Sequence, residues 1–316
     1  AGRAVTLSSA SLDLSIAPGT RGVLGALRVA QLDSPEGSMA ALSATVGGGM
    51  AQPLDVTVNG TRLARNGVEL DGFGVELVVR DGDAEIRSVR VAGLGGNLTA
   101  RGRVVRDRDG VFRAALQPEW SGVDVSGLVA LLGERGAARG VFSGHASLET
   151  SGTSVEAALD TLNGTFDAKL EDAVERRARE HLPELLAQTS DIGFLRVSGT
   201  VNEGRIRIGE LRLDARHYAL EARGRVAFDG DTDLDGTLSL SRDASRTLLS
   251  GAAGGVLQAL AGNDDQVRIP VAVRGRYPDL RSAPSSDFLA DAAARAIRLP
   301  GNERAAGFLR RLLGGD

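Results

Sequence analysis

The feature that most constrains this chain is the alternation along residues 217–240, which read HYALEARGRVAFDGDTDLDGTLSL. A period of two is the spacing of a β-strand that has one apolar face and one solvated face. The charged residues of this stretch fall on odd positions between Glu221 and Asp235. The apolar residues fall on even positions, namely Tyr218, Leu220, Ala222, Val226, Phe228, Leu234, Leu238 and Leu240. The stretch therefore predicts strands with a single apolar face.

Asn-Gly and Asp-Gly pairs recur along the chain, most of them between alternating apolar runs. Such pairs tolerate the positive φ angles of tight hairpin turns. They begin at Asn59, Asn66, Asp71, Asp81, Asp109, Asn163, Asp229 and Asp235. Because hairpins join neighbouring antiparallel strands, the pairs predict an antiparallel meander.

An internal repeat supports this prediction. Residues 75–116 overlay residues 197–238 without a gap. Within the overlay, LTARGRV at 98–104 corresponds to LEARGRV at 220–226, and VAVRGRY at 271–277 is a third, shorter copy. The sheet is therefore expected to grow by repetition of one strand module.

Short helices are expected between the strand modules. The chain is predicted to contain a first β-sheet module at residues 1–147, which opens within a strand pattern as a fragment of a longer protein would, and a second module at residues 148–316. The predicted helices lie near residues 124–133, 153–162, 171–189, 244–262 and 285–313. The predicted fold is mainly β, a long curled antiparallel sheet with an apolar inner face and C-terminal capping helices.

Composition excludes several functional classes. The formal charge is −4 over 316 residues, which disfavours nucleic acid as a partner because phosphate binding requires a basic surface. The chain has no cysteine, so disulfides and thiolate chemistry are excluded. His145, His181 and His217 lie far apart, and no nucleophile or phosphate-loop motif is present. We expect no enzymatic activity and no cofactor.

Two charged motifs have plain structural interpretations. DTDLDG, at residues 231–236, matches the first half of a calcium loop, but the twelfth position is Arg242 in place of the bidentate Glu. A polar hairpin tip explains this motif, and no metal site is predicted. The Arg-Gly-Arg triplets at 101–103, 223–225 and 274–276 are interpreted as the solvated face of strands, with each glycine on the apolar face, where it leaves space.

The C-terminal helix is amphipathic. Its apolar side chains are Phe308, Leu309, Leu312 and Leu313. This surface would suit either contact with a membrane or a cap over an open sheet edge.

Three stretches resemble a known family. They are LETSGTSVEAALDTLNGTFDAKLEDA (148–173), FLRVSGTVNEGRIRIGELRLDARHYALEARGRVAFDGDTDLDGTLSLS (194–241) and VRIPVAVRGRYPDLRSAPSSDF (267–288). Together they resemble the C-terminal region of AsmA-like outer-membrane-biogenesis proteins, which are related to TamB-like proteins. The similarity covers residues 148–298 well and residues 1–147 only through the repeat.

The resemblance implies a periplasmic, bridge-like carrier of phospholipid or another acyl-chain lipid in a Gram-negative cell. Such proteins are anchored in the inner membrane by an N-terminal helix, and we expect that anchor to lie outside the present sequence. Their C-terminal part approaches the outer membrane or an outer-membrane protein. The family has no catalytic motif, so the resemblance assigns no catalytic residues to this chain.

On this hypothesis the apolar strand faces form a groove that shelters lipid. The residues expected to line it are Leu98, Val104, Phe112, Leu116, Leu220, Val226, Phe228, Leu234, Leu238, Leu240, Val267, Ile269, Val271 and Val273. The alternative is a β-rich scaffold or assembly factor in which the same residues fill a sealed core, because alternation occurs in both cases.

Overall fold

The computed structural model describes residues 6–17, 22–34, 37–49, 53–65, 68–81, 83–107, 109–131, 139–174, 191–249, 266–276, 279–285 and 288. The chain divides into two compact units. The first comprises Ala1–Leu170 with Val201–Gly204, and the second comprises Glu171–Thr200 with Arg205–Asp316.

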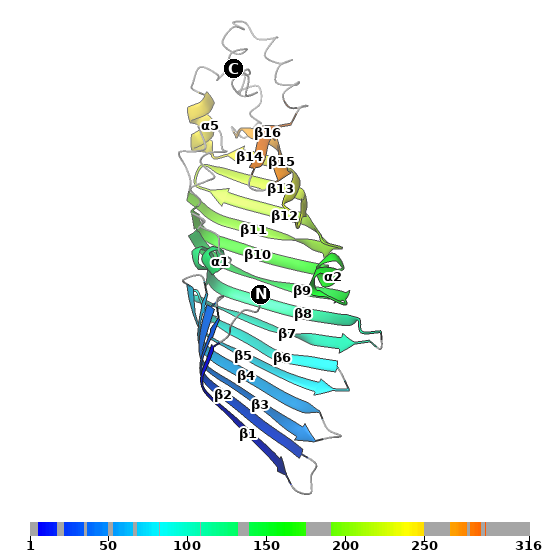
Figure 1. Cartoon of the computed structure of the whole chain (residues 1–316). Coiled ribbons are helices and arrows are strands. Elements are labelled where there is room, and N and C mark those ends of the chain that lie inside the picture. The colour runs from blue at the N-terminus through cyan, green and yellow to red at the C-terminus, as the bar shows by residue number, and fades with distance from the viewer. Residues whose placement is uncertain are drawn as a thin grey trace, which may run out of the picture. The chain divides into compact units, whose positions relative to one another are not determined.

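Strands dominate the described residues. Their hydrogen-bonded order in the sheet follows the sequence, from β1 to β16, so each strand lies beside its neighbours in the chain (Figure 1). The strands are β1 (Thr6–Ala17), β2 (Gly22–Ser34), β3 (Gly37–Gly49), β4 (Leu54–Arg65), β5 (Val68–Arg80), β6 (Asp83–Gly93), β7 (Gly96–Arg106), β8 (Phe112–Asp124), β9 (Arg139–Gly152), β10 (Asn163–Val174), β11 (Asp191–Asn202), β12 (Arg205–Ala215), β13 (Tyr218–Ala227), β14 (Asp231–Leu240), β15 (Arg268–Arg276) and β16 (Asp279–Pro284). The predicted class is confirmed: mainly β, with an antiparallel sheet that is not closed into a barrel and few short helices.

The helices of the described residues are short. They are α1 (Val125–Leu131), α2 (Val155–Asp160) and α5 (Arg242–Leu249). In the first unit, α1 and α2 lie at opposite ends of the strands (Figure 1). The Ser154 hydroxyl caps α2 by accepting a hydrogen bond from the amide of Ala157 at 3.2 Å.

The predicted helices have different outcomes. Those near residues 124–133 and 153–162 are confirmed by α1 and α2. The third prediction is wrong at its start, because Glu171–Val174 continue β10; its remainder lies outside the described residues. Helix α5 begins at Arg242, two residues earlier than predicted, and residues 250–262 lie outside the described part. Of the predicted C-terminal helices, only Ser285 and the helical Phe288 are described.

The Asn-Gly and Asp-Gly pairs prove to be of two kinds. Asp81, Asp109 and Asp229 lie in the turns that join strands, as predicted, and Asp81 has a φ of 51°. The pairs at Asn59, Asp71, Asn163 and Asp235 instead lie inside β4, β5, β10 and β14, and the pair at Asn66 lies outside the described residues. At Asn59 the reason is packing: the Phe73 ring lies where a Cβ on Gly60 would stand, with Cζ 2.9 Å from it.

The repeat is visible in strand register. Ile86 faces Gly102 between β6 and β7, as Ile208 faces Gly224 between β12 and β13. A register shift follows at the equivalent place in each pair, between Ile86 and Val89 and between Ile208 and Leu211. A β-bulge at matching positions shows that these two strand pairs are copies of one module.

The gapless overlay fails at the next strand. Gly102 faces Leu116, whereas Gly224 faces Leu234, which the overlay had matched with Phe112. The turn between β7 and β8 is longer than the turn between β13 and β14, so the copies are offset by four residues from there on. Because four is even, the apolar side chains stay on the same face.

Candidate functional site

In the second unit, most residues predicted to line a groove lie on one face of the sheet. Side chains of directly opposite residues in an antiparallel pair project to the same side. Leu220 faces Leu238, and Leu238 faces Ile269 on the next strand. The apolar face of the second unit consists of Ile206, Ile208, Leu211, Leu213, Tyr218, Leu220, Val226, Leu234, Leu238, Leu240, Ile269, Val271 and Val273.

The first unit has a corresponding apolar face. Leu98 faces Trp120, and Val104 faces Ala114, which shares its side of β8 with Phe112 and Leu116. Trp120 was not among the residues predicted to lie on this face, although it continues the even-numbered pattern of β8. The apolar face of the first unit includes Leu54, Val56, Val58, Phe73, Val75, Leu77, Val79, Ile86, Val89, Val91, Leu98, Val104, Phe112, Leu116, Trp120, Phe142 and Leu148.

This face of the first unit is open to solvent along much of its extent. Leu98 is 36% exposed and Phe112 is 43% exposed. Apart from neighbouring strands, the main contacts of the described sheet are with α1, which touches β5, β8 and β9, and with α2, which touches β9. No second sheet packs on this face within the described part of the unit. An apolar surface of this kind usually marks a site for a ligand or partner.

Large side chains on the apolar face lie over glycines of the next strand. A Cβ on Gly144 would stand 2.7 Å from Cζ2 of Trp120, and a Cβ on Gly102 would stand 2.8 Å from Cδ2 of Leu116. The glycines were expected to leave space, and neighbouring side chains occupy that space instead. The Trp120 ring also stacks on Phe142, with ring centroids 5.4 Å apart. The side chains therefore lie along the sheet.

One end of the second unit's apolar face is covered by protein. Val267 has no exposed surface, and Leu240 is 3% exposed. The buried Ser245 of α5 accepts a hydrogen bond from the Val267 amide at 3.1 Å, which fixes the helix over this end. Val267 and Leu240 thus belong to a small core beneath α5, and their assignment to a lipid groove stays a prediction. Phe228 lies in the turn after β13, outside the strands.

The opposite face of the sheet carries charges that pair with one another. In the second unit Asp233 contacts Arg225 at 3.0 Å and Arg274 at 2.7 Å. A hydrogen bond from Arg274 to Asp235 raises the pKa of the guanidinium. The DTDLDG carboxylates therefore lie along a strand beside arginines, as a solvated face. No cluster of metal-ligating side chains occurs among the residues that the structure describes.

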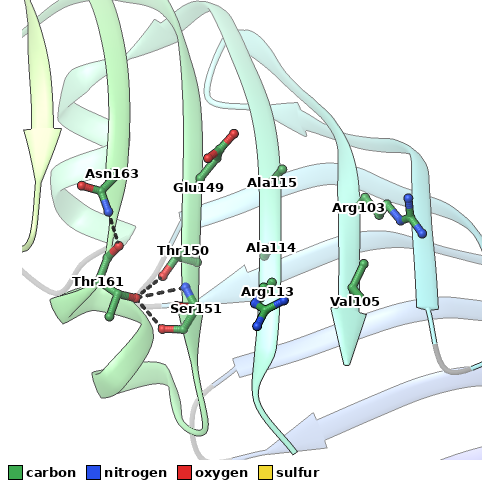
Figure 2. A pocket seen from close by; sticks show the side chains of 10 residues that line it. All are labelled: Arg103, Val105, Arg113, Ala114, Ala115, Glu149, Thr150, Ser151, Thr161 and Asn163. Carbon is green, nitrogen blue, oxygen red and sulfur yellow. Dashed lines mark hydrogen bonds between the residues drawn. The ribbon is translucent and has the colours of Figure 1, made fainter. Parts of the chain in front are cut away.

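A cavity of about 360 Å³ opens on the charged side of the first unit, beside α2 (Figure 2). Thr161 anchors the helix there: its hydroxyl donates to the Ser151 carbonyl oxygen and accepts from the Ser151 amide at 3.0 Å (Figure 2). The two arginines at the cavity already have partners, since Arg103 binds Asp83 and Arg113 binds Asp107. The cavity therefore joins a helix to the sheet, and the remaining charged side chain of its lining is the exposed Glu149.

The histidines do not meet in the described structure. His145 is an exposed residue of β9, His217 lies between β12 and β13, and His181 lies outside the described residues. The apolar residues Phe308, Leu309, Leu312 and Leu313 also lie outside them. Among the described helices, none combines the length and the apolar character that crossing a bilayer demands.

Comparisons with known proteins leave the family undetermined. No family model, curated protein or solved structure matches this chain. The resemblance to AsmA-like proteins therefore stays a prediction from the sequence. The structural basis for a function is the contrast between the apolar face and the charged face of the sheet.

Proposed function

We propose that this chain is a non-enzymatic lipid-carrying module, in which the apolar strand faces shelter acyl chains. The observation that supports the proposal most directly is the open apolar face of the first unit, continuous in register from β4 to β9. The opposite face carries paired charges, so the chain stays soluble while one face remains available.

The physical need for such a surface is large. Exposure of hydrocarbon to water costs about 0.8 kcal/mol per methylene, which amounts to about 12 kcal/mol for a sixteen-carbon chain. A lipid that crosses an aqueous compartment requires a surface that replaces its apolar surroundings. A sheet with one apolar face, curled so that this face is inward, would supply such a surface as a groove.

The resemblance to AsmA-like proteins agrees with this proposal and supplies a setting. The lipid would be a phospholipid or a similar acyl-chain lipid, moving through the periplasm between the inner and outer membranes. Tethering would come from an inner-membrane anchor, and the C-terminal end would approach the outer membrane or a protein in it. The module would thereby support outer-membrane biogenesis.

A second candidate is a scaffold whose apolar faces are sealed by protein. The covered end of the second unit, where Val267 and Leu240 lie beneath α5, favours this alternative locally. If such coverage extended over the whole face in solution, no lipid would be held.

The single tryptophan of the chain provides a direct test. Trp120 lies on the apolar face opposite Leu98, so a brominated acyl chain on this face would quench its fluorescence. We expect purified protein to retain lipid detectable by mass spectrometry, and brominated phospholipid to quench Trp120. Absence of both signals would reject the lipid-carrier proposal.

Two matched variants sharpen the test. Leu98→Arg places a charge on the apolar face, whereas Thr99→Arg places the same charge on the neighbouring position of the opposite face. Because Leu98 is 36% exposed, both variants should fold, as circular dichroism would show. A carrier loses lipid only with Leu98→Arg. Unfolding of Leu98→Arg alone would favour the sealed scaffold.

A further inference from the structure

One charged residue interrupts the apolar face of the first unit. In β5–β9, the strand positions on this face carry apolar or small side chains, with Thr150 as a polar member, and a single charged residue, Arg106. Register assigns it to this face, because Val104 faces Ala114 and Arg106 faces Phe112. Arg106 is the last residue of β7, so the charge stands at the end of an apolar row.

The surroundings of Arg106 differ from those of the other strand arginines. On the charged face, Arg87, Arg90 and Arg103 bind Asp55, Glu76 and Asp83, respectively. Among the described residues, no carboxylate forms an ion pair with Arg106. The adjacent Asp107 is bound to Arg113 at 3.0 Å. Arg106 is therefore an exposed cation with unused hydrogen-bond donors.

An aromatic ring holds the guanidinium in place. The Arg106 Cζ atom lies 5.2 Å from the centroid of the Phe112 ring, which is 43% exposed. Stacking on an aromatic face occupies the plane of the guanidinium and leaves its N–H edge available. That edge matches the geometry of a carboxylate or phosphate, which it can bind through two parallel hydrogen bonds.

The apolar row behind Arg106 is long enough for one acyl chain. From Leu98 to Arg106 the strand rises about 26 Å, at about 3.3 Å per residue. One leaflet of a bilayer, half of its hydrocarbon core, is about 15 Å thick. A chain lying along β7 and β8 would thus fit between Trp120, which faces Leu98, and the Arg106–Phe112 pair.

We propose that Arg106, stacked on Phe112, binds the anionic headgroup of an amphiphile whose acyl chain lies on the apolar face towards Leu98. This inference rests on the proposed lipid-carrying function and specifies the ligand: a lipid with a phosphate or carboxylate at one end. It also fixes the orientation of the ligand, with its head at the α2 end of the strands and its tail at the α1 end.

The experiment compares an anionic ligand with its neutral analogue. Dibrominated stearate and the corresponding neutral alcohol share one hydrocarbon chain, and both quench Trp120 when bound beside it. The variant Arg106→Gln removes the charge, and Arg106→Lys keeps it without the bidentate fork. Arg101→Gln is the matched control, because Arg101 is exposed on the opposite face of the same strand and hydrogen-bonds only Gln117 among the partners that the structure gives.

We expect Arg106→Gln to weaken stearate binding about five- to tenfold, the effect of losing a charge-assisted hydrogen bond at a partly screened site. Binding of the alcohol should change less than twofold. Arg106→Lys should be intermediate, and Arg101→Gln should match the parent protein. Equal losses for both ligands, or no loss for either, would overturn the assignment of Arg106.

Two further measurements separate the alternatives. Titration with inorganic phosphate, monitored by chemical shifts of Arg106, distinguishes a lipid headgroup from a free anion: phosphate binding as tight as stearate binding would overturn the amphiphile proposal. If neither brominated ligand quenches Trp120 in the parent protein, the lipid-carrying function itself fails. If both brominated ligands quench Trp120 and Arg106→Gln leaves stearate binding unchanged, only the headgroup assignment fails.

Discussion

The openness of the apolar face makes a quantitative prediction about two leucines of the first unit. Leu98 in β7 is 36% exposed, whereas Leu70 in β5 is 7% exposed. Both are replaced by alanine, which removes the equivalent of three methylenes at about 0.8 kcal/mol each, or about 2.4 kcal/mol when fully buried. About two thirds of Leu98 is buried, and its truncation would leave no enclosed cavity. The free energy of unfolding should therefore fall by about 1.5 kcal/mol in Leu98→Ala.

Leu70→Ala should cost more. Leu70 faces Gly93 across the strand pair, and a Cβ on Gly93 would stand 2.8 Å from Leu70 Cδ2, so the leucine lies tightly against the neighbouring backbone. Truncation adds a cavity to the lost burial, and the expected cost is about 3 kcal/mol.

Urea unfolding followed by Trp120 fluorescence measures both variants in the same transition, because both leucines and the tryptophan belong to the first unit. The reasoning is refuted if Leu98→Ala is as costly as Leu70→Ala. That result would mean that protein covers Leu98 in solution, by a second layer or a second copy of the chain.

Three further predictions concern packing and pH. Gly102→Val should destabilise the first unit by at least about 2 kcal/mol in urea unfolding, because its Cβ would collide with the Ala115 carbonyl oxygen. Trp120→Phe should leave stability unchanged or raise it by about 1 kcal/mol by calorimetry, since no described group accepts a hydrogen bond from the buried indole N–H. Burial raises the pKa of Tyr218, so this residue stabilises the fold at neutral pH, and that contribution should fall as pH rises above about 10; Tyr218→Phe should flatten this alkaline loss in pH-dependent unfolding.

Alternation along the sequence was sufficient to predict the strands and their faces. Leu220, Leu238 and Ile269 were assigned to one side by parity alone, and register places them opposite one another. The repeat likewise predicted two similar strand pairs. The structure has them in β6–β7 and β12–β13, where a bulge shifts the parity of the apolar positions in the same way.

What covers a face cannot be derived from parity. Val267 has the same alternation as Ile269, yet Ser245 of α5 binds its amide and the helix buries it. The four-residue offset between β8 and its copy β14 could not be predicted from the sequence either, because an even shift leaves the apolar pattern intact. Arg106 had no distinguishing signal beyond its even number at the end of an apolar row.

The linear strand order has a consequence for how such a chain could change its dimensions. Because each of the strands from β1 to β16 hydrogen-bonds with its sequence neighbours, one hairpin can be duplicated or deleted without rethreading the others. Each added hairpin would extend the sheet by two strand spacings, about 9.6 Å. Because a hairpin adds two antiparallel strands, the chain direction of each edge strand would stay the same. Genetic duplication of hairpins would thus lengthen the sheet in steps of two strands.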